Sequence, residues 1–152
     1  MKKVILIFSL LFLIGCNKVK SKDMALSQVL EEIKVIAEFE NTQTADLTNQ
    51  KTAAQYGIDA TAISEGYVYY SNNDSTADEV IIARAASQSD VESLEKAVGA
   101  ELSAKTEAWK NNEKESSKIE NHVMRTIGDC VLLAIGDRAM EIDQVFNQLR
   151  AE

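Results

Sequence analysis

The sequence predicts an α+β fold, in which an antiparallel sheet of about four strands from two hairpins packs against helices. Stretches with apolar residues three and four apart alternate with short runs of β-branched and aromatic residues. Those strand-like runs come in two neighbouring pairs, as hairpins require. The expected order is therefore α-α-β-β-α-β-β-α, and helices that interrupt paired strands favour the α+β class.

Length and composition set the limits of this fold. The chain has 152 residues, of which 45% are hydrophobic, so it suits a single folded domain, expected over residues 23–152. Its 24 acidic and 16 basic side chains give a net charge of −8, and a phosphate backbone would repel such a protein, so nucleic-acid binding is disfavoured. Two cysteines are too few for a disulfide-rich scaffold or a four-cysteine zinc site.

Two helices are expected before the first strand. Residues 24–39 carry apolar side chains at helical spacing, and Asp23 suits the N-cap position. A shorter helix over residues 48–56 would end at Gly57, since glycine is common just after a helix. Residues 58–64 are expected to add one more helical turn.

The first hairpin is expected after Gly66. The aromatic and β-branched run at residues 67–70 predicts one strand, and residues 80–86 predict a second. The polar residues 71–78 between them form the connecting loop. A long helix follows, because Ser89 and Glu92 are spaced as a capping box ahead of an apolar stripe: Val91, Leu94, Val98 and Leu102.

The second hairpin lies beyond a polar stretch at residues 110–118. Its strands are expected at residues 121–127 and 130–135, since Gly128-Asp129 suits a two-residue turn. Asp137 is a suitable cap for the last helix, which carries four apolar residues on one face: Ile142, Val145, Phe146 and Leu149.

The first fifteen residues have the pattern of a signal peptide. Lys2 and Lys3 precede a run from position 4 to 14 that is apolar except for one serine, too short to span a bilayer as a permanent anchor. The run ends in Leu13-Ile14-Gly15-Cys16, which resembles the lipobox of bacterial lipoproteins. This resemblance implies removal of residues 1–15, a diacylglyceryl group on Cys16, and attachment to the extracytoplasmic face of the cell membrane.

Residues 16–22 are then a short basic connection between lipid and domain. They carry Lys18, Lys20 and Lys22 and no acid, whereas residues 23–152 hold 11 basic and 24 acidic side chains. The lysines either contact anionic lipid headgroups, at about 1 kcal/mol each, or belong to a solvated spacer. The sequence leaves both interpretations open.

A search for catalytic and metal-binding residues yields no convincing set. Cys130 and His122 would lie about 16 Å apart along the second hairpin, too far for a catalytic dyad, so Cys130 is expected to be a buried thiol. The oxygen-rich residues 73–75, with Asp78 and Glu79, lack the ligand spacing of a calcium loop. We therefore expect no catalytic, cofactor-binding or metal-binding residues.

Aromatic side chains are the candidates for a partner-binding surface. Tyr67 and Tyr69 would share one face of the first strand, and Tyr70 would lie on the other. Packing in the core is favoured for most of them, but an open sheet face would present Tyr67 and Tyr69 to a partner. For Trp109, at the end of the long helix, packing and partner contact are equally plausible.

The body of the chain also resembles a family of small bacterial lipoproteins. The motifs are Tyr56-Gly57-Ile58-Asp59, Gly66-Tyr67-Val68-Tyr69 and the run from Ala77 to Ile82, with Gly128 and the run from Val131 to Ile135 near the end. The resemblance covers most of residues 26–149. The family is defined as a domain of unknown function, so it implies no site residues.

Two functions remain in view. The first is a membrane-anchored, non-catalytic binding or accessory module of the cell envelope, with an envelope protein as the candidate partner. The alternative is an envelope hydrolase or small-ligand binder that uses carboxylates and tyrosines. A deep pocket lined by carboxylates with raised pKa values would favour the alternative, whereas an open sheet face carrying Tyr67 or Tyr69 without a pocket would favour the first. The sequence sets no oligomeric state.

Overall fold

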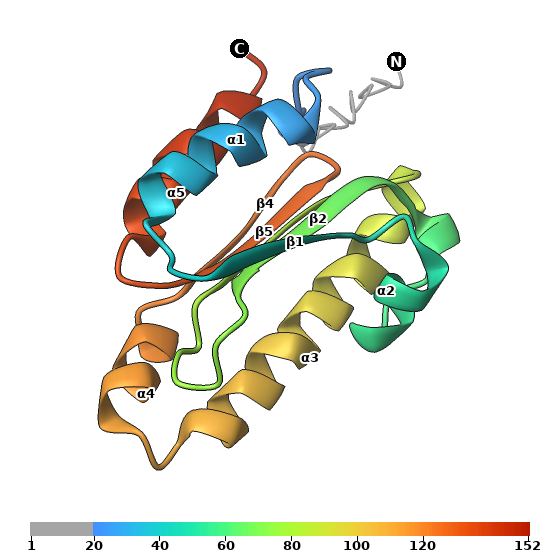
Figure 1. Cartoon of the computed structure of the whole chain (residues 1–152). Coiled ribbons are helices and arrows are strands. Elements are labelled where there is room, and N and C mark those ends of the chain that lie inside the picture. The colour runs from blue at the N-terminus through green and yellow to red at the C-terminus, as the bar shows by residue number, and fades with distance from the viewer. Residues whose placement is uncertain (1–19) are drawn as a thin grey trace, which may run out of the picture.

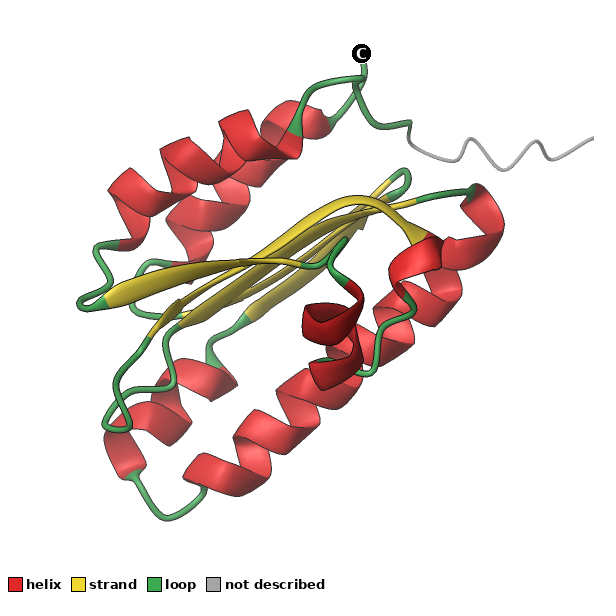
Figure 2. Ribbon diagram, turned by 45° about the vertical axis from the view of Figure 1, so that its right-hand side comes forward, coloured by secondary structure: helices red, strands yellow, loops and turns green. Residues whose placement is uncertain are grey.

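The computed structural model describes residues 20–152, which form one antiparallel sheet between two layers of helices (Figures 1 and 2). The strands lie in the spatial order β1-β2-β3-β5-β4. The α+β prediction is confirmed, but the sheet has five strands instead of about four: β1 Thr42–Asp46, β2 Ile63–Ser71, β3 Glu79–Ala85, β4 Val123–Ile127 and β5 Cys130–Ile135.

Helices cover both faces of this sheet. One layer contains α1 and α5, and the other contains α2, α3 and α4 (Figure 1). Short 3₁₀ turns stand at residues 60–62, 88–90 and 147–149. The α-helices are α1 Leu26–Ala37, α2 Gln50–Gln55, α3 Val91–Trp109, α4 Glu113–Glu120 and α5 Ala139–Phe146.

The unpredicted strand is β1, at one edge of the sheet. It pairs antiparallel with β2 over its whole length, from Thr42 opposite Ser71 to Asp46 opposite Tyr67. Four of its five residues are exposed, and it has no aliphatic side chain larger than alanine. Because a solvent-exposed edge strand buries little surface, its sequence lacks the alternation that reveals a half-buried strand.

The unpredicted helix is α4, which lies within the polar stretch at residues 110–118 and continues to Glu120. Among its buried residues, only Ile119 is apolar, so the sequence has no apolar stripe from which this helix could be predicted. Local polar contacts stabilise it instead: the Asn112 side chain accepts a hydrogen bond from the Glu115 amide, as an N-cap does.

Three predicted helix caps are wrong. Asp23 does not cap α1; the carboxylate of Glu65, from β2, accepts hydrogen bonds from the first amides of that helix at 2.8 and 2.9 Å. The residue before α3 is Asp90, and no side chain caps that helix, so the Ser89–Glu92 capping box is absent. Arg138, rather than Asp137, precedes α5.

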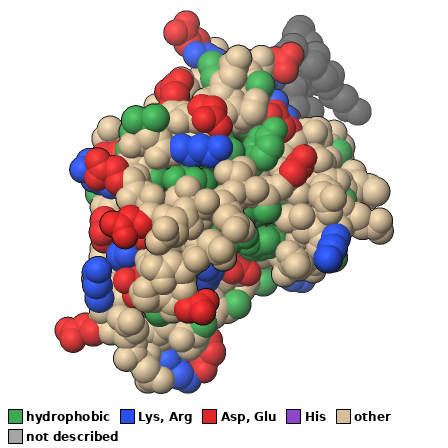
Figure 3. All heavy atoms as spheres, in the orientation of Figure 1, with side chains coloured by type: hydrophobic (Ala, Val, Ile, Leu, Met, Phe, Trp, Pro, Cys, Tyr) green, Lys and Arg blue, Asp and Glu red, His purple; other side chains and the backbone are tan. Residues whose placement is uncertain are grey.

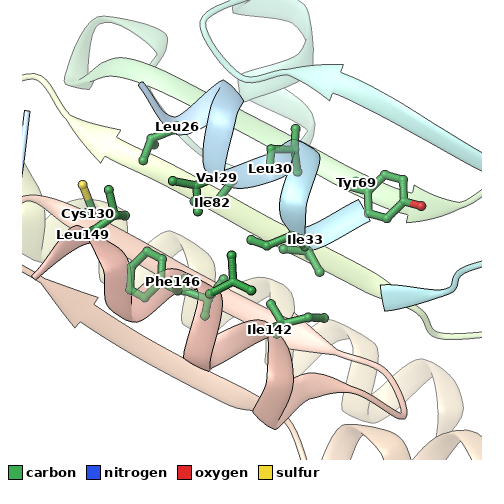
Figure 4. Packing of buried hydrophobic residues seen from close by; sticks show 14 of the residues in the cluster. Leu26, Val29, Leu30, Ile33, Tyr69, Ile82, Cys130, Ile142, Phe146 and Leu149 are labelled. Carbon is green, nitrogen blue, oxygen red and sulfur yellow. The ribbon is translucent and has the colours of Figure 1, made fainter. Parts of the chain in front are cut away.

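The first core cluster lies between the sheet and the α1–α5 layer. Figure 4 shows side chains of the two helices pointing toward each other and toward β3 and β5. Leu26, Val29, Leu30 and Ile33 supply the apolar stripe of α1, at the spacing that the sequence predicted. From α5 and the turn after it, the predicted face is buried: Ile142, Val145, Phe146 and Leu149.

The second core cluster lies between the sheet and α3. Val91, Leu94 and Val98 of α3 are buried against the alternate side chains of the strands, including Ile81 and Leu133. Successive residues of a strand point to opposite faces, so the fully buried runs of β3 and β5 supply both clusters. The sheet is therefore a two-sided core element.

The β4–β5 hairpin has the predicted two-residue turn. Ile127 pairs with Cys130, and Gly128 adopts a φ of 60°, which glycine tolerates better than other residues. The β2–β3 hairpin also forms, with Tyr69 opposite Val80. Both predicted strand pairs are thus confirmed.

Residues 20–22 run beside the carboxyl-terminal segment. The Lys22 amide donates to the Leu149 carbonyl at 2.7 Å, and the Ala151 amide donates to the Lys20 carbonyl at 3.0 Å. The predicted signal peptide and Cys16 lie outside the described residues. Within residues 20–152, no helix combines the length and apolar character needed to cross a membrane.

Candidate functional site

A polar cavity of about 280 Å³ lies at the end of the sheet where β3 begins and β5 ends. The β2–β3 loop, α4 and the chain after β5 meet there, and Figure 1 shows this loop beside α4. We call it the acidic cavity. All eleven residues that line it are polar: Glu38, Glu40, Ser71, Asn73, Ser75, Thr76, Asp78, Lys114, Glu115, Lys118 and Asp137.

A buried lysine holds the wall of the acidic cavity together. The Lys118 Nζ atom lies 2.8 Å from Asp78 Oδ1 and 3.3 Å from Glu115 Oε2, and it also donates to Thr76. Burial alone would lower the pKa of Lys118, but the hydrogen bond to Asp78 and the nearby negative charges outweigh it and raise the pKa. This ammonium group is therefore fully charged at neutral pH.

Glu115 joins the β2–β3 loop to α4. Its carboxylate accepts a hydrogen bond from the Ala77 amide at 2.8 Å and another from the Thr76 hydroxyl at 3.1 Å. Burial favours the neutral acid, yet these bonds and the charge of Lys118 together lower the pKa of Glu115. The loop is thus fixed to the helix by an ionised, hydrogen-bonded carboxylate.

Some polar groups of the cavity wall have no hydrogen-bond or salt-bridge partner among the described residues. Ser71, at the end of β2, is 8% exposed, and its hydroxyl has no hydrogen-bond partner among the described residues. Glu40 and Asp137 form no salt bridge within residues 20–152, although both line the cavity. Five carboxylates face two lysines here, so the cavity carries an excess of negative charge.

A shallower groove of about 810 Å³ continues from the cavity along α4 and the start of α5. The two hollows share Lys114, Lys118 and Asp137, so they are continuous. The groove adds the side chains of Glu113 and Glu141 to its walls. Acidic side chains elsewhere are interspersed with basic ones over the face that Figure 3 shows.

A second buried carboxyl group lies on the other face of the sheet. Glu79, the first residue of β3, is 3% exposed, and its Oε1 atom has no hydrogen-bond partner among the described residues. Burial, opposed by Lys105 at 3.4 Å, raises the pKa of Glu79 to about 7. Burial and the charge of Glu79 also raise the pKa of Tyr56. These groups do not line the acidic cavity.

The structure separates the aromatic residues proposed as a partner surface. Tyr67 is half-buried beside α1, with its hydroxyl 3.3 Å from Glu65. Tyr69 is only 5% exposed, and its ring stacks on Phe39 with centroids 5.3 Å apart. Trp109 packs at the edge of the second core cluster, on the opposite face of the sheet from the two tyrosines.

Cys130 lies in the first core cluster, at the end of the sheet opposite the acidic cavity. Burial raises the pKa of its thiol to about 11, although the Arg84 Nε donor at 3.3 Å works in the opposite direction. His122 precedes β4 and lies 2.6 Å from the Ile119 carbonyl through its Nδ1 atom. The hairpin therefore holds the two side chains at opposite ends of β4 and β5.

The residues of the oxygen-rich loop noted in the sequence do not converge on one site, because their side chains contact different parts of the structure. Asp78 contributes to the acidic cavity, whereas the Glu79 side chain contacts Lys105 of α3. The Asn73 side chain is engaged by the Ser75 amide and hydroxyl. Over residues 20–152, no group of three His, Cys, Asp or Glu side chains is arranged to hold a metal ion.

Glu115 and Lys118 are the residues that sequence reasoning missed. They are spaced three apart, which places them on one face of a helix, and that spacing was the available signal. Without an apolar stripe to reveal α4, the pair was indistinguishable from the other charges of a polar stretch.

Residues 20–152 thus have an α+β fold, with helices on both faces of an antiparallel sheet and a polar cavity at one end of the sheet. The chain belongs to the family described as domain of unknown function DUF4358, which matches residues 37–136. That range contains all five strands and the Asp78–Lys118–Glu115 cluster, but not α5 and only the last residue of α1. No curated protein and no solved structure matches the chain.

Proposed function

We propose that this protein is a lipid-anchored lipoprotein of the bacterial cell envelope that serves as a non-catalytic binding or accessory module. A diacylglyceryl group on Cys16 would hold it on the extracytoplasmic face of the membrane, with an envelope protein as the candidate partner. Two acyl chains are needed because one chain gives only marginal, reversible membrane binding.

The observation that carries this proposal is the way the chain joins the fold after the lipobox. Residues 20–22 pair with residues 149–151, so only three residues separate Cys16 from the folded domain. The four residue steps from Cys16 to Lys20 span at most about 14 Å. A lipid on Cys16 would therefore hold the β4–β5 end of the sheet close to the membrane, because Ser21 lies against Gly128 in that turn.

This arrangement supports a binding role for the acidic cavity. β5 runs from Cys130, at the end near residues 20–22, to Ile135, beside the cavity. Five residue steps of strand span about 17 Å, so the sheet would separate the cavity from the bilayer. The domain would present its polar, acidic end to the surroundings.

A hydrolase, the alternative, has less support. A general acid needs a carboxyl group that remains protonated near neutral pH. Among the described residues, Glu79 has such a raised pKa, but it does not line the cavity, and the pKa of Glu115 is lowered. The small-ligand part of that alternative agrees with the polar cavity.

The test is replacement of the lipidated residue. Cys16→Ser should move the protein from the membrane fraction to unprocessed precursor or to the medium and abolish incorporation of labelled palmitate. Cys130→Ala is the matched control, since it removes the other cysteine and should leave the protein in the membrane fraction. A processed Cys16→Ser protein that stays membrane-bound would contradict the proposal.

A further inference from the structure

We propose that the acidic cavity binds the alkylammonium groups of a small hydrophilic polycation. The inference deepens the proposed binding function by naming the class of ligand. It rests on the lining of the cavity, its charge balance and an unpartnered buried hydroxyl group.

The lining excludes an apolar ligand. Every side chain that faces the cavity is polar, so an apolar group would remove hydrogen-bonding atoms from water without replacing their partners. A ligand that gains by entering must supply donors or charges of its own. The site therefore suits a hydrophilic, charged molecule.

The charge balance selects a cation. Lys118 already neutralises part of the charge of Asp78 and Glu115, and Arg138 lies 3.2 Å from Glu38. Glu40 and Asp137 remain without a salt bridge within residues 20–152. Lys114 also lines the cavity without a salt bridge within residues 20–152, but the five carboxylates outnumber the two lysines, so the cavity favours an ammonium group over an anion.

Ser71 supplies the independent observation. Its side chain is more than nine-tenths buried at the cavity wall, and its hydroxyl oxygen has no partner among the described residues. Buried polar groups are normally hydrogen-bonded, so an unpartnered one beside a hollow indicates a missing donor or acceptor. An ammonium group is a compact donor of three hydrogen bonds and can satisfy this oxygen.

An extended polyamine fits better than a metal ion. No described group of three acidic, histidine or cysteine side chains is placed to coordinate a metal. The carboxylates instead follow one another from the cavity into the adjoining groove, where Glu113 and Glu141 continue the series. Charges spread along a surface complement charges spread along a flexible chain.

The experiment is titration calorimetry on the full-length protein in a neutral detergent, with spermidine as the probe. Asp137→Asn and Glu40→Gln should each weaken spermidine binding by about ten-fold, and Ser71→Ala by a few-fold. Asp74→Asn is the matched control: it makes the same charge change in the β2–β3 loop but does not line the cavity. It should change the dissociation constant by less than about two-fold.

Two results would overturn the inference. One is the absence of saturable binding up to about 5 mM spermidine at low salt. The other is equal weakening by Asp74→Asn and Asp137→Asn, which would indicate general attraction to an acidic protein. Circular dichroism of each variant checks that the fold is intact.

A second arm identifies the source of the ammonium groups. A short lysine-containing peptide, acetylated at its amino terminus, is titrated under the same conditions. Stronger binding of spermidine assigns the cavity to free polyamines, and stronger binding of the peptide assigns it to lysine side chains of a protein. Membrane fractionation of Cys16→Ser is independent of this titration, so failure of the cavity assignment and failure of the anchor assignment are distinguishable.

Discussion

Glu115 and Glu79 are both almost inaccessible to solvent, yet the pKa values of their carboxyl groups shift in opposite directions. Their exposed fractions are 2% and 3%. The pKa of Glu115 is lowered, whereas the pKa of Glu79 is raised to about 7. Burial raises the pKa of both groups, and at Glu115 other interactions outweigh it.

At Glu79 desolvation dominates and the charge of Glu101 adds to it, whereas at Glu115 hydrogen-bond donors and Lys118 outweigh desolvation. Glu115 accepts hydrogen bonds from a backbone amide and a hydroxyl group, and a buried lysine lies 3.3 Å away. Glu79 has Lys105 at 3.4 Å, but one of its oxygens is unpartnered among the described residues. A buried acid is therefore a structural anchor where it is fully hydrogen-bonded, and a titrating group where it is not.

The largest effect is expected for removal of the anchor. Glu115→Ala leaves the buried ammonium group of Lys118 with one carboxylate fewer and frees the β2–β3 loop from α4. We expect the free energy of unfolding to fall by about 3 kcal/mol. Chemical denaturation measures this change.

The matched control is Glu113→Ala. It removes an exposed carboxylate from the first turn of the same helix and should cost less than about 1 kcal/mol. Equal losses in the two variants would break the comparison, because burial and hydrogen bonding would then contribute nothing specific at Glu115.

The next effect is a pH dependence that Glu79 alone should produce. Its pKa is raised from 4.5 to about 7 in the folded protein, so the folded state holds a proton that the unfolded state has lost in this interval. Stability is therefore fully present below about pH 4.5 and is lost as the pH rises to about 7, by about 3 kcal/mol in total. Above that pH the contribution is constant.

Glu79→Gln tests this assignment, since the amide cannot ionise. Denaturation at several pH values should show that the difference in stability between wild type and variant changes by about 3 kcal/mol between pH 4.5 and pH 8, in favour of the variant at high pH. Parallel curves would show that Glu79 does not titrate in this range.

The smallest effect is expected for Cys130. It is a third buried titratable group, which can be compared with Glu115 and Glu79. Burial raises its thiol pKa as it raises that of Glu79, and Arg84 opposes the shift. Cys130→Ala should cost about 1–2 kcal/mol, because it removes one sulfur atom from a closely packed cluster. A loss of spermidine binding at unchanged stability would contradict the placement of the binding site at the other end of the sheet.

Sequence periodicity predicted the elements that bury an apolar stripe. The stripe of α1, the paired strands and the Gly128 turn all follow from residues that must face a core or adopt a positive φ. β1 and α4 escaped prediction because polar contacts, and not apolar burial, stabilise them. The acidic cavity depends on α4, so the site was missed together with the helix.

Partners that are distant in the sequence explain the remaining errors. The cap of α1 comes from Glu65, 39 residues beyond the amide of Leu26, and no local pattern connects the two. Likewise, the loop around Asp78 and the helix around Lys118 are 40 residues apart. The sequence shows the acidic residue Asp78 in the loop, but only the folded chain shows that Lys118 lies beside it.

The pairing of residues 20–22 with residues 149–151 also bears on the order of folding. It closes a loop of about 130 residues, the largest among the described contacts, whereas the two hairpins close only short loops. Contacts of such long range are reached late, after local hairpins and helices have formed. Completion of the domain would therefore end at the corner where residues 20–22 meet the finished sheet, which is the corner that the proposed lipid on Cys16 would hold near the membrane.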